Sequence, residues 1–327
     1  MGDAIVLQGV RKTFGDKEAV RELDLVVPEG GLYGFIGPNG AGKTTTIRLI
    51  MSILFPDRGE ISVLGHGSAL QAKDRIGYLP EERGVYRKMK AAGFLAYIAR
   101  LKGCDAAVVR RRVEEWLERV ELADSANKRC EELSKGMQQK LQFVAAVIHE
   151  PDLLILDEPF SGLDPLNQRL LRELVLEQHR RGATIIFSTH VMFQAEQICD
   201  HIVMINDGDK VLDETLTGIR AKYDPRTILF EPLDPGTGVS ALMALPEIRS
   251  LKPVNGAFEI TLADGVDPAR AIGGIATAVR AARVELSRPT LEDVFIRIVT
   301  GEAAAEDDDV ARLRAGLRDE VAAGAEA

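Results

Sequence analysis

The 327-residue chain contains no run of about twenty apolar residues, so the sequence predicts no segment that spans a bilayer. The N-terminus has neither the basic region nor the long apolar core of a signal peptide. Only three cysteines occur, in no paired or metal-like spacing, which favours reduced thiols and a cytosolic protein. The net charge of −9 argues against a general basic surface, and we therefore expect no nucleic-acid partner.

The length of the chain is sufficient for two domains. In the first part, the sequence pattern predicts antiparallel strands, followed by continuous apolar strands that are typical of a buried parallel sheet. A helical insertion is predicted between strands of that sheet. After a change in composition near residue 223, the order β-α-β-β-α-β predicts a small ferredoxin-like domain, so the fold class is α/β with an α+β extension. The predicted parts are 1–222, with the insertion at about 89–150, then 223–300, and an acidic, alanine-rich tail at 301–327.

Apolar residues recur at helical spacing within the predicted insertion. Val109, Val113, Trp116 and Val120 stand at i, i+4, i+7 and i+11, the pattern of an amphipathic helix. The single tryptophan of the chain is therefore expected in the core rather than in a ligand site.

Two features mark the end of the chain. Thr290 and Asp293 fit a capping box that opens a helix reaching to about Val299. In the tail, four apolar residues at helical spacing are compatible with one more helix, and a mobile or loosely docked tail is the alternative. These four residues are Val310, Leu313, Leu317 and Val321.

The most informative segment is Gly37–Thr44, with the sequence GPNGAGKT, which fits the phosphate-binding pattern G-x-x-x-x-G-K-[ST] at every fixed position. A predicted strand at 32–36 enters it and a predicted helix at 45–51 leaves it, so the helix N-terminus faces the anion. Lys43 suits the β- and γ-phosphates, and the Thr44 hydroxyl suits Mg²⁺. The predicted phosphate-binding residues are Gly37, Pro38, Asn39, Gly40, Ala41, Gly42, Lys43, Thr44 and Thr45.

Two acidic residues follow the predicted apolar strand Leu153–Leu156. Hydrolysis of a γ-phosphate requires a positioned Mg²⁺ and a group that activates water. Asp157, at the strand tip, is the candidate metal ligand, and Glu158 is the candidate base. A second buried strand ends at His190, where a neutral imidazole is expected to hydrogen-bond a γ-phosphate oxygen and orient the water.

The order of these motifs resembles the nucleotide-binding subunits of ABC transporters over about residues 4–215. The phosphate loop is similar to the Walker A motif of that family, and Leu153–Glu158 is similar to its Walker B motif. Leu133–Met137, with the sequence LSKGM, resembles the family signature. The resemblance further matches Ser161–Asp164 to the D-loop, His190 to the switch histidine and Phe14 to the aromatic residue that lies against adenine.

The resemblance implies an ATPase that binds ATP and Mg²⁺ and powers a separate integral-membrane permease. In this family each ATP lies between the Walker motifs of one subunit and the signature of a second, so Ser134, Gly136 and Asp164 are expected to contact nucleotide. Ser134 precedes a predicted helix at 137–148, whose N-terminus also suits a phosphate. A head-to-tail dimer follows, with an identical or a different partner. We expect it in the cytoplasm, peripheral on the inner face of the cell membrane, with the helical segment Arg83–Leu101 against the permease.

Two departures from the family pattern bear on the site. Glu81 stands where the family usually has Gln, and its carboxylate is a third candidate metal ligand beside Thr44 and Asp157. Lys135 and Met137 replace Gly and Gln in the signature. Because the signature serine and the following glycine are kept, we expect activity to be retained.

The segments Pro80–Tyr86 and Leu291–Phe295 are similar to those of a subgroup of prokaryotic exporters, the sodium-extrusion (NatA-type) and drug-efflux ATP-binding subunits. This similarity implies export. One alternative is a soluble ABC-type ATPase of translation or DNA repair, although such proteins usually carry two nucleotide domains or a long coiled coil. A further hypothesis, compatible with transport, makes the C-terminal domain a ligand sensor.

Overall fold

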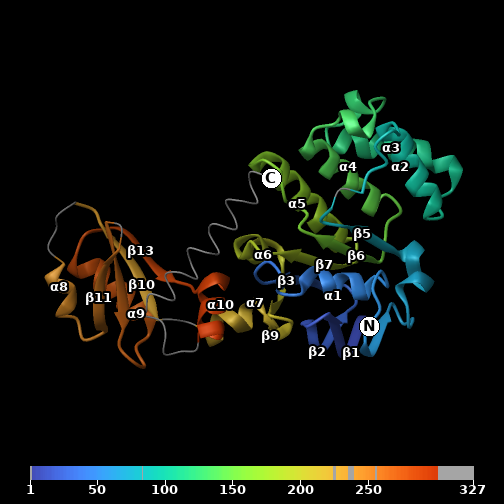
Figure 1. Cartoon of the computed structure of the whole chain (residues 1–327). Helices are drawn as coiled ribbons and strands as arrows, with labels where there is room; N and C mark the ends of the chain where they lie inside the picture. Colours follow the sequence, from blue (N-terminus) through green and yellow to red (C-terminus); the bar gives the residue numbers. More distant parts are fainter. Residues whose placement is uncertain (1, 83, 224–225, 235–238, 255, 301–327) are drawn as a thin grey trace. The chain divides into compact units, whose positions relative to one another are not determined.

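The computed structural model describes residues 2–82, 84–223, 226–234, 239–254 and 256–300, and the chain divides into two compact units (Figure 1). The first unit runs to Leu216 and resumes at Phe295, and the second is Thr217–Val294. Both boundaries fall next to or inside a helix, at α7 (Leu216–Lys222) and at α10 (Leu291–Thr300). The helical stripe considered for residues 310–321 lies outside the described residues and stays a prediction.

An antiparallel sheet opens the first unit, as the sequence predicted. It has the order β2-β1-β4, and both neighbouring pairs are antiparallel. The strands are β1 (Asp3–Phe14), β2 (Lys17–Pro28) and β4 (Arg58–Val63). β1 ends at Phe14, the residue expected against adenine.

The second sheet of this unit has the order β5-β6-β7-β3-β8-β9, in which β9 alone is antiparallel to its neighbour. Every residue of β3, β6 and β7 is buried, which confirms the prediction of a parallel sheet made of continuous apolar strands. The strands are β3 (Leu32–Ile36), β5 (Ile76–Leu79), β6 (Leu153–Asp157), β7 (Thr184–Thr189), β8 (His201–Asn206) and β9 (Asp209–Thr215).

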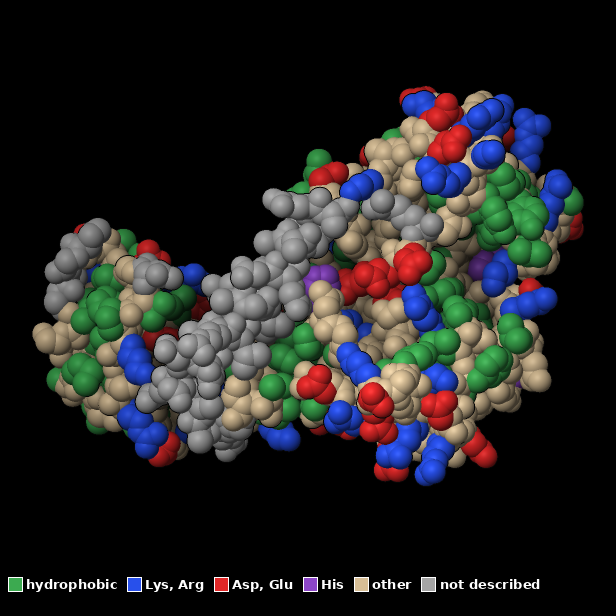
Figure 2. All heavy atoms as spheres, in the orientation of Figure 1, with side chains coloured by type: hydrophobic (Ala, Val, Ile, Leu, Met, Phe, Trp, Pro, Cys, Tyr) green, Lys and Arg blue, Asp and Glu red, His purple; other side chains and the backbone are tan. Residues whose placement is uncertain are grey.

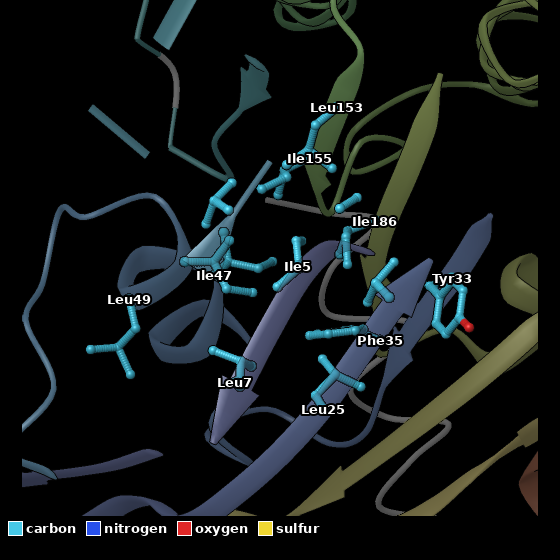
Figure 3. Packing of buried hydrophobic residues seen from close by; sticks show 14 of the residues in the cluster. Ile5, Leu7, Leu25, Tyr33, Phe35, Ile47, Leu49, Leu153, Ile155 and Ile186 are labelled. Carbon is cyan, nitrogen blue, oxygen red and sulfur yellow. The ribbon is translucent and has the colours of Figure 1, made fainter. Parts of the chain in front are cut away.

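One hydrophobic core joins the two sheets and helix α1 (Lys43–Ile50). Because α1 packs into this core, the loop that precedes it is held at a fixed place beside the parallel sheet. Figure 3 shows side chains of both sheets and of α1 converging there, among them Ile5, Leu7, Leu25, Tyr33, Phe35, Ile47, Leu49, Leu153, Ile155 and Ile186.

The remaining helices of the first unit lie mainly in and after the predicted insertion. Three short 3₁₀ turns accompany them, at Ala69–Arg75, Ala123–Ser125 and Cys130–Glu132. None of the helices in the described part of the chain combines the length and apolar character needed to span a bilayer. The helices are α2 (Ala91–Leu101), α3 (Ala106–Arg119), α4 (Lys135–Val147), α5 (Pro165–Arg180) and α6 (Met192–Ile198).

The insertion confirms one sequence prediction and corrects another. Val109, Val113, Trp116 and Val120 are all buried, as their helical spacing indicated. The helical segment predicted at Arg83–Leu101 is wrong in its first part, because α2 begins only at Ala91. Lys90 is held in an antiparallel bridge with Arg129, so the chain is extended where the helix was expected to continue. Arg83 itself lies outside the described residues.

The second unit has the predicted element order β-α-β-β-α-β. Its sheet has the order β11-β12-β10-β13 with every neighbouring pair antiparallel, and its core lies between the sheet and the two helices. Helix α8 is shorter than the predicted 238–245. The elements are β10 (Thr227–Pro232), α8 (Ser240–Met243), β11 (Ile248–Val254), β12 (Ala257–Leu262), α9 (Pro268–Ala278) and β13 (Ala281–Ser287).

The predicted capping box at α10 is confirmed. The Asp293 backbone N–H donates to Thr290 Oγ1 at 3.1 Å, and the Thr290 backbone N–H donates to Asp293 Oδ2 at 3.2 Å. These reciprocal bonds satisfy two donors that would otherwise be left unpaired at the helix start.

The separate core of the second unit makes its independence testable. We expect Phe230→Ala to destabilise this unit by about 3–5 kcal/mol, since the ring is completely buried in its core. Nucleotide affinity of the first unit should not change. Urea unfolding and a nucleotide titration measure both effects, and Phe258→Ala, a half-buried neighbour, should cost less. A parallel loss of nucleotide binding would contradict the domain assignment.

Candidate functional site

The phosphate loop joins β3 to α1 and requires glycine at two positions. Gly37 and Gly42 have φ angles of +152° and +113°. A Cβ on Gly37 would lie 2.0 Å from the Ile205 carbonyl oxygen, and one on Gly42 would lie 2.4 Å from the Ala19 carbonyl oxygen. The loop therefore passes against neighbouring backbone at both ends, and only glycine fits there.

Lys43, the first residue of α1, is buried against this loop. Its Nζ donates to the carbonyl oxygens of Gly37 at 2.8 Å and Pro38 at 3.1 Å. A phosphate oxygen carries negative charge and accepts a stronger hydrogen bond from an ammonium group than a neutral carbonyl does. The ammonium group is thus positioned beside the loop that would hold the phosphates.

Asp157 ends β6 as a buried carboxylate. Its Oδ1 accepts hydrogen bonds from the Ser188 hydroxyl and from the Thr44 hydroxyl, the latter at 3.4 Å. Its Oδ2 is buried and has no hydrogen-bond partner among the described residues. Burial raises the pKa of this carboxyl above its ordinary value. A buried oxygen without a partner is the kind of group that a cation would satisfy.

Glu158 follows Asp157 in a left-handed backbone conformation, with φ +48°. Its carboxylate accepts hydrogen bonds from the Thr189 hydroxyl at 3.2 Å and from the His190 backbone N–H at 2.8 Å. A left-handed φ at a non-glycine residue is strained by about 1–3 kcal/mol, and the surrounding bonds hold it in place. The carboxylate is therefore fixed at the carboxyl edge of the sheet.

The geometry restricts the role predicted for His190. Its Nδ1 lies 2.7 Å from Glu158 Oε1, and because a carboxylate only accepts hydrogen bonds, Nδ1 carries the proton. In the neutral ring Nε2 is then an acceptor. The predicted hydrogen bond from a neutral imidazole to a γ-phosphate oxygen thus requires the ring either to release Glu158 or to become protonated.

Glu81, in the loop after β5, faces the same charged region. Partial burial raises its pKa, and the negative charges of Asp157 and Glu158 raise it further. A cation bound among these carboxylates would oppose that repulsion. Cation binding would therefore lower the pKa of Glu81 and favour its ionised form.

A cavity of about 410 Å³ collects most of the predicted nucleotide-binding residues. Its volume lies within the range of small-molecule sites. Phe14 lines it and is half exposed, so a flat ring face is available. The lining residues are Phe14, Lys17, Ala19, Asn39, Gly40, Gly42, Lys43, Thr44, Thr45, Glu81 and Glu158.

The predicted signature residues do not line that cavity. Ser134 is the N-cap of α4 and accepts a hydrogen bond from the Met137 backbone N–H at 3.3 Å, so its own O–H proton is still available for donation. A Cβ on Gly136 would lie 3.4 Å from Leu163 Cδ2. The signature thus lies next to the D-loop of its own chain rather than next to its own phosphate loop.

A second cavity of about 610 Å³ contains Asp164, His190 and Glu158, so Glu158 lines both cavities. Asp164 is the N-cap of α5 and accepts hydrogen bonds from the backbone N–H groups of Leu166 and Asn167. The bond from the Asn167 backbone N–H is the main reason that the pKa of Asp164 is lowered.

Some residues of the site were not predicted from the sequence. Ser188 and Thr189 hold the two carboxylates, and Lys17 and Ala19 line the phosphate-loop cavity. The signal for the first two was present, since two hydroxyl residues end a buried apolar strand. Lys17 begins β2 and is paired with Phe14, the predicted adenine contact, so its closeness to Phe14 in the sequence was the available signal.

The oxygen donors of the site fit a divalent cation. No three His, Cys, Asp or Glu side chains converge on a common point within the described ranges. The oxygen donors present are the Thr44 hydroxyl, the unpartnered Asp157 Oδ2 and the Glu81 carboxylate. An all-oxygen set of this size suits a hard cation whose remaining ligands are water and the phosphates of a nucleotide.

The fold and the site define a class of protein. A glycine-rich loop between a buried strand and a helix, beside a strand that ends in an acidic pair, is the arrangement of P-loop nucleotide hydrolases. The family described as "ABC transporter" matches residues 20–161, and the family described as "ATP-binding protein DrrA1-3-like, C-terminal domain" matches residues 215–299.

Known proteins give the same assignment. An uncharacterised ABC transporter ATP-binding protein, YhaQ of Bacillus subtilis, is 40% identical and covers 90% of this chain and 98% of its own length. The daunorubicin resistance ATP-binding protein DrrA3 of Streptomyces coeruleorubidus is 33% identical over 91% of this chain and 96% of its own. A solved structure titled as the ATP binding subunit of an ABC transporter has a TM-score of 0.64 and 33% identity, over 67% of this chain and 93% of that one.

The chain therefore belongs to the ABC transporter ATP-binding proteins, as the order of its motifs predicted. It is an ATP-binding and ATP-hydrolysing subunit of a transporter that works with a membrane permease. The match to DrrA3 and to the DrrA-like C-terminal domain confirms the resemblance to drug-efflux subunits.

The contact at Gly42 gives a matched pair of variants. We expect Gly42→Ala to displace the loop and lower ATP affinity, because the new methyl group would meet the Ala19 carbonyl. Gly40→Ala meets only Lys17 Nζ, at 3.7 Å, and carries only a backbone strain of about 1–2 kcal/mol. Thermal unfolding and ATP titration compare them. Equal losses in the two variants would show that the Ala19 contact does not constrain the loop.

Proposed function

We propose that this chain powers an exporter by closing on ATP as one half of a head-to-tail dimer and reopening after hydrolysis. One observation carries the proposal: Ser134 and Gly136 do not line the cavity that contains the phosphate loop of the same chain. A second subunit is needed to bring a signature to the exposed side of that cavity. ATP bound between two subunits stabilises the closed form, and its hydrolysis removes that stabilisation.

Mg²⁺ is the cation proposed for the oxygen donors of the site. Thr44 and Asp157 would hold it, with Glu81 as a further ligand, and when bound it would neutralise charge that develops on the β- and γ-phosphates. The unpartnered Oδ2 of Asp157 supports this assignment.

The side chains of the chain itself have separate proposed roles. Lys43 donates to the phosphates, and the backbone N–H groups of the loop surround them. Phe14 lies against the adenine ring. Glu158 accepts a proton from the attacking water, and the bonds from Thr189 and His190 keep its carboxylate in position.

Export is the proposed direction of transport. The support is the C-terminal domain of the DrrA1-3 type together with the likeness to a daunorubicin resistance protein along most of both chains. The transported substrate is recognised by the permease, so its identity follows from the partner rather than from this chain.

The proposed permease contact lies on α2 and the residues just before it, on the inner face of the cell membrane. Tyr86 packs edge-on against Phe94 and Tyr97, and both tyrosines are about half exposed. Leu101 is 60% exposed. An exposed aromatic cluster suits a protein interface. The loop that carries Glu81 lines the phosphate-loop cavity and leads directly into this cluster. A movement of the chain at one of the two places would therefore be passed to the other.

The same loop contacts α4. Gln142 is buried on α4, and its Nε2 donates to the Glu82 carbonyl oxygen at 3.4 Å. Because α4 begins at the signature serine, this bond connects the signature helix to the loop with Glu81. Closure of the dimer and rearrangement of the permease contact are therefore mechanically linked in this proposal.

The alternative is a soluble ABC-type ATPase of translation or DNA repair. The sequence contains one phosphate loop and one signature, without a long coiled coil. On the face shown in Figure 2, cationic and anionic side chains are interspersed over the first unit, which does not favour a nucleic-acid surface. Transport is the better-supported proposal.

Removal of the proposed base tests the chemistry. We expect Glu158→Gln to keep ATP binding and to lower turnover at least about a hundredfold, because the amide cannot accept the proton of water. Closed dimers should accumulate with ATP. Phosphate release and light scattering measure the two effects.

Glu82→Gln is the matched control, since it makes the same chemical change at a side chain that is 88% exposed. It should turn over at the wild-type rate. If Glu158→Gln also did so, Glu158 would not be the base.

The partner is tested first by a pull-down from membranes and cytosol, using tagged Glu158→Gln protein and ATP with Lys43→Ala as the control that binds ATP poorly. We expect a multi-spanning protein to co-purify in an ATP-dependent manner, as identified by mass spectrometry. Recovery of only ribosomal or DNA-repair proteins would place the chain in the soluble class instead.

A further inference from the structure

The sheet of the second unit has two edges that differ in character. β11 forms one edge and contains Lys252 and Pro253, residues that oppose pairing with a further strand. β13 forms the other edge and contains neither lysine nor proline along Ala281–Ser287. Its outer side has no neighbouring strand in the described part of the chain. Of the two edges, β13 is the one that can accept another strand.

The two faces of β13 carry different side chains. Val284 and Leu286 pack against the core of the second unit. Arg283 and Glu285 are about half exposed on the opposite face, where Arg283 Nε donates to Glu285 Oε2 at 2.8 Å. The strand therefore presents an apolar row on one face and one pair of opposite charges on the other.

We propose that β13 pairs with β13 of a second copy of this chain, antiparallel and centred on Val284, to give one continuous eight-stranded sheet. In this register Arg283 lies directly opposite Glu285 of the second copy, and Glu285 lies opposite its Arg283. Opposite charges that face each other across two strands stabilise the pair. On the other face, Val284 meets its own symmetry mate, so the apolar faces of the two sheets join there.

The two registers next to this one, centred on Arg283 and on Glu285, are unfavourable. The twofold axis of such a pair is perpendicular to the sheet, so two residues that lie opposite each other point to the same face. Because side chains alternate between faces along a strand, the axis must pass through a residue rather than between two residues. Centring on Arg283 places two arginines opposite each other, and centring on Glu285 does the same with two glutamates. Like charges directly opposite each other destabilise a strand pair. Charge complementarity thus favours a second copy as the occupant, and it favours the register centred on Val284 over the two registers next to it.

This inference rests on the proposed function, because the strand pair would join the two ATP-binding subunits of the proposed dimer. The second subunit is then an identical chain. The strand pairing does not involve nucleotide. It is expected to persist in the open state, whereas closure of the phosphate sites requires ATP.

The test uses the full chain without nucleotide, in the Lys43→Ala background, and measures self-association by sedimentation velocity. Arg283→Glu and Glu285→Arg should each weaken it about tenfold or more, since each variant faces like charges across the axis. The decisive arm mixes the two variants in equal amounts. The mixture should form a heterodimer. The Arg283→Glu variant has glutamate at positions 283 and 285, and these lie opposite the two arginines that the Glu285→Arg variant has at positions 285 and 283.

Each side chain has two contacts, the Arg283–Glu285 bond within its own strand and the proposed ion pair with the second copy. Mixing the two variants restores only the ion pair between copies, because neither variant can form the bond within its own strand. Glu259→Arg is the control, since Glu259 and Glu285 are both paired with Leu229, on opposite sides of β10, and so share a face. It should leave self-association unchanged. Circular dichroism verifies that all variants fold.

Wild-type protein that stays monomeric without nucleotide would overturn the proposal, as would single variants that associate normally or a mixture that fails to associate. None of these results touches ATP-dependent closure, which the Glu158→Gln protein reports separately. Failure of the strand pairing and failure of the proposed function are therefore distinguishable.

Discussion

The parallel register of β3, β7 and β6 is the constraint on which the site depends. β7 lies between the other two strands, pairing Thr189 with Ile36 on one side and Ser188 with Asp157 on the other. The phosphate loop leaves the end of β3, and the acidic pair stands at the end of β6. The middle strand supplies the hydroxyls that bond to both acids. Ser188 and Thr189 are consecutive and point to opposite faces of the sheet, so a shift of one residue in β7 would exchange their faces and break both contacts. The buried apolar faces of all three strands prevent that shift, so the hydrophobic core fixes the polar chemistry.

The acidic pair is costly in the absence of a ligand. Asp157 is buried with one oxygen unpartnered, and Glu158 adopts a left-handed backbone. Both features lower stability, and both are compensated by the surrounding core rather than by the site. Burial raises the pKa of Asp157 and that of Glu81, and the negative charge of Glu158 raises both further. A cation in the proposed magnesium site would oppose this repulsion and satisfy the unpartnered oxygen of Asp157.

Local patterns in the sequence were sufficient for much of this fold. Gly37–Thr44 could be recognised because a sharp turn against backbone admits only glycine at fixed positions, and the continuous apolar strands indicated a parallel sheet. The order β-α-β-β-α-β of the second unit was also readable from spacing. Other features depend on contacts between distant segments. A helix was predicted from residue 83, yet Met89 donates to the Tyr86 carbonyl oxygen in a turn and Lys90 is extended in a bridge with Arg129, so the helix begins only at Ala91. Lys17 reaches the cavity because the turn between β1 and β2 places it opposite Phe14, and its residue type alone does not mark it as a site residue. The hydrogen bond from His190 to Glu158, which decides the tautomer, follows from side-chain geometry alone.

An ATP site completed by another subunit has a kinetic difficulty. If two chains that are not bound to a permease met only through nucleotide, each hydrolysis would let them diffuse apart, and the next closure would depend on the concentration of free chains. A second contact that does not need nucleotide makes closure intramolecular and raises the effective concentration of the partner signature. The contact need not be strong, because a short strand pair with two cross-strand ion pairs is enough to bias encounter without preventing the sites from opening. The unprotected edge of β13 has this character, while the lysine and proline of β11 keep the other edge from extending the sheet into a fibre. A closed twofold pair is then the only strand assembly that the second unit favours.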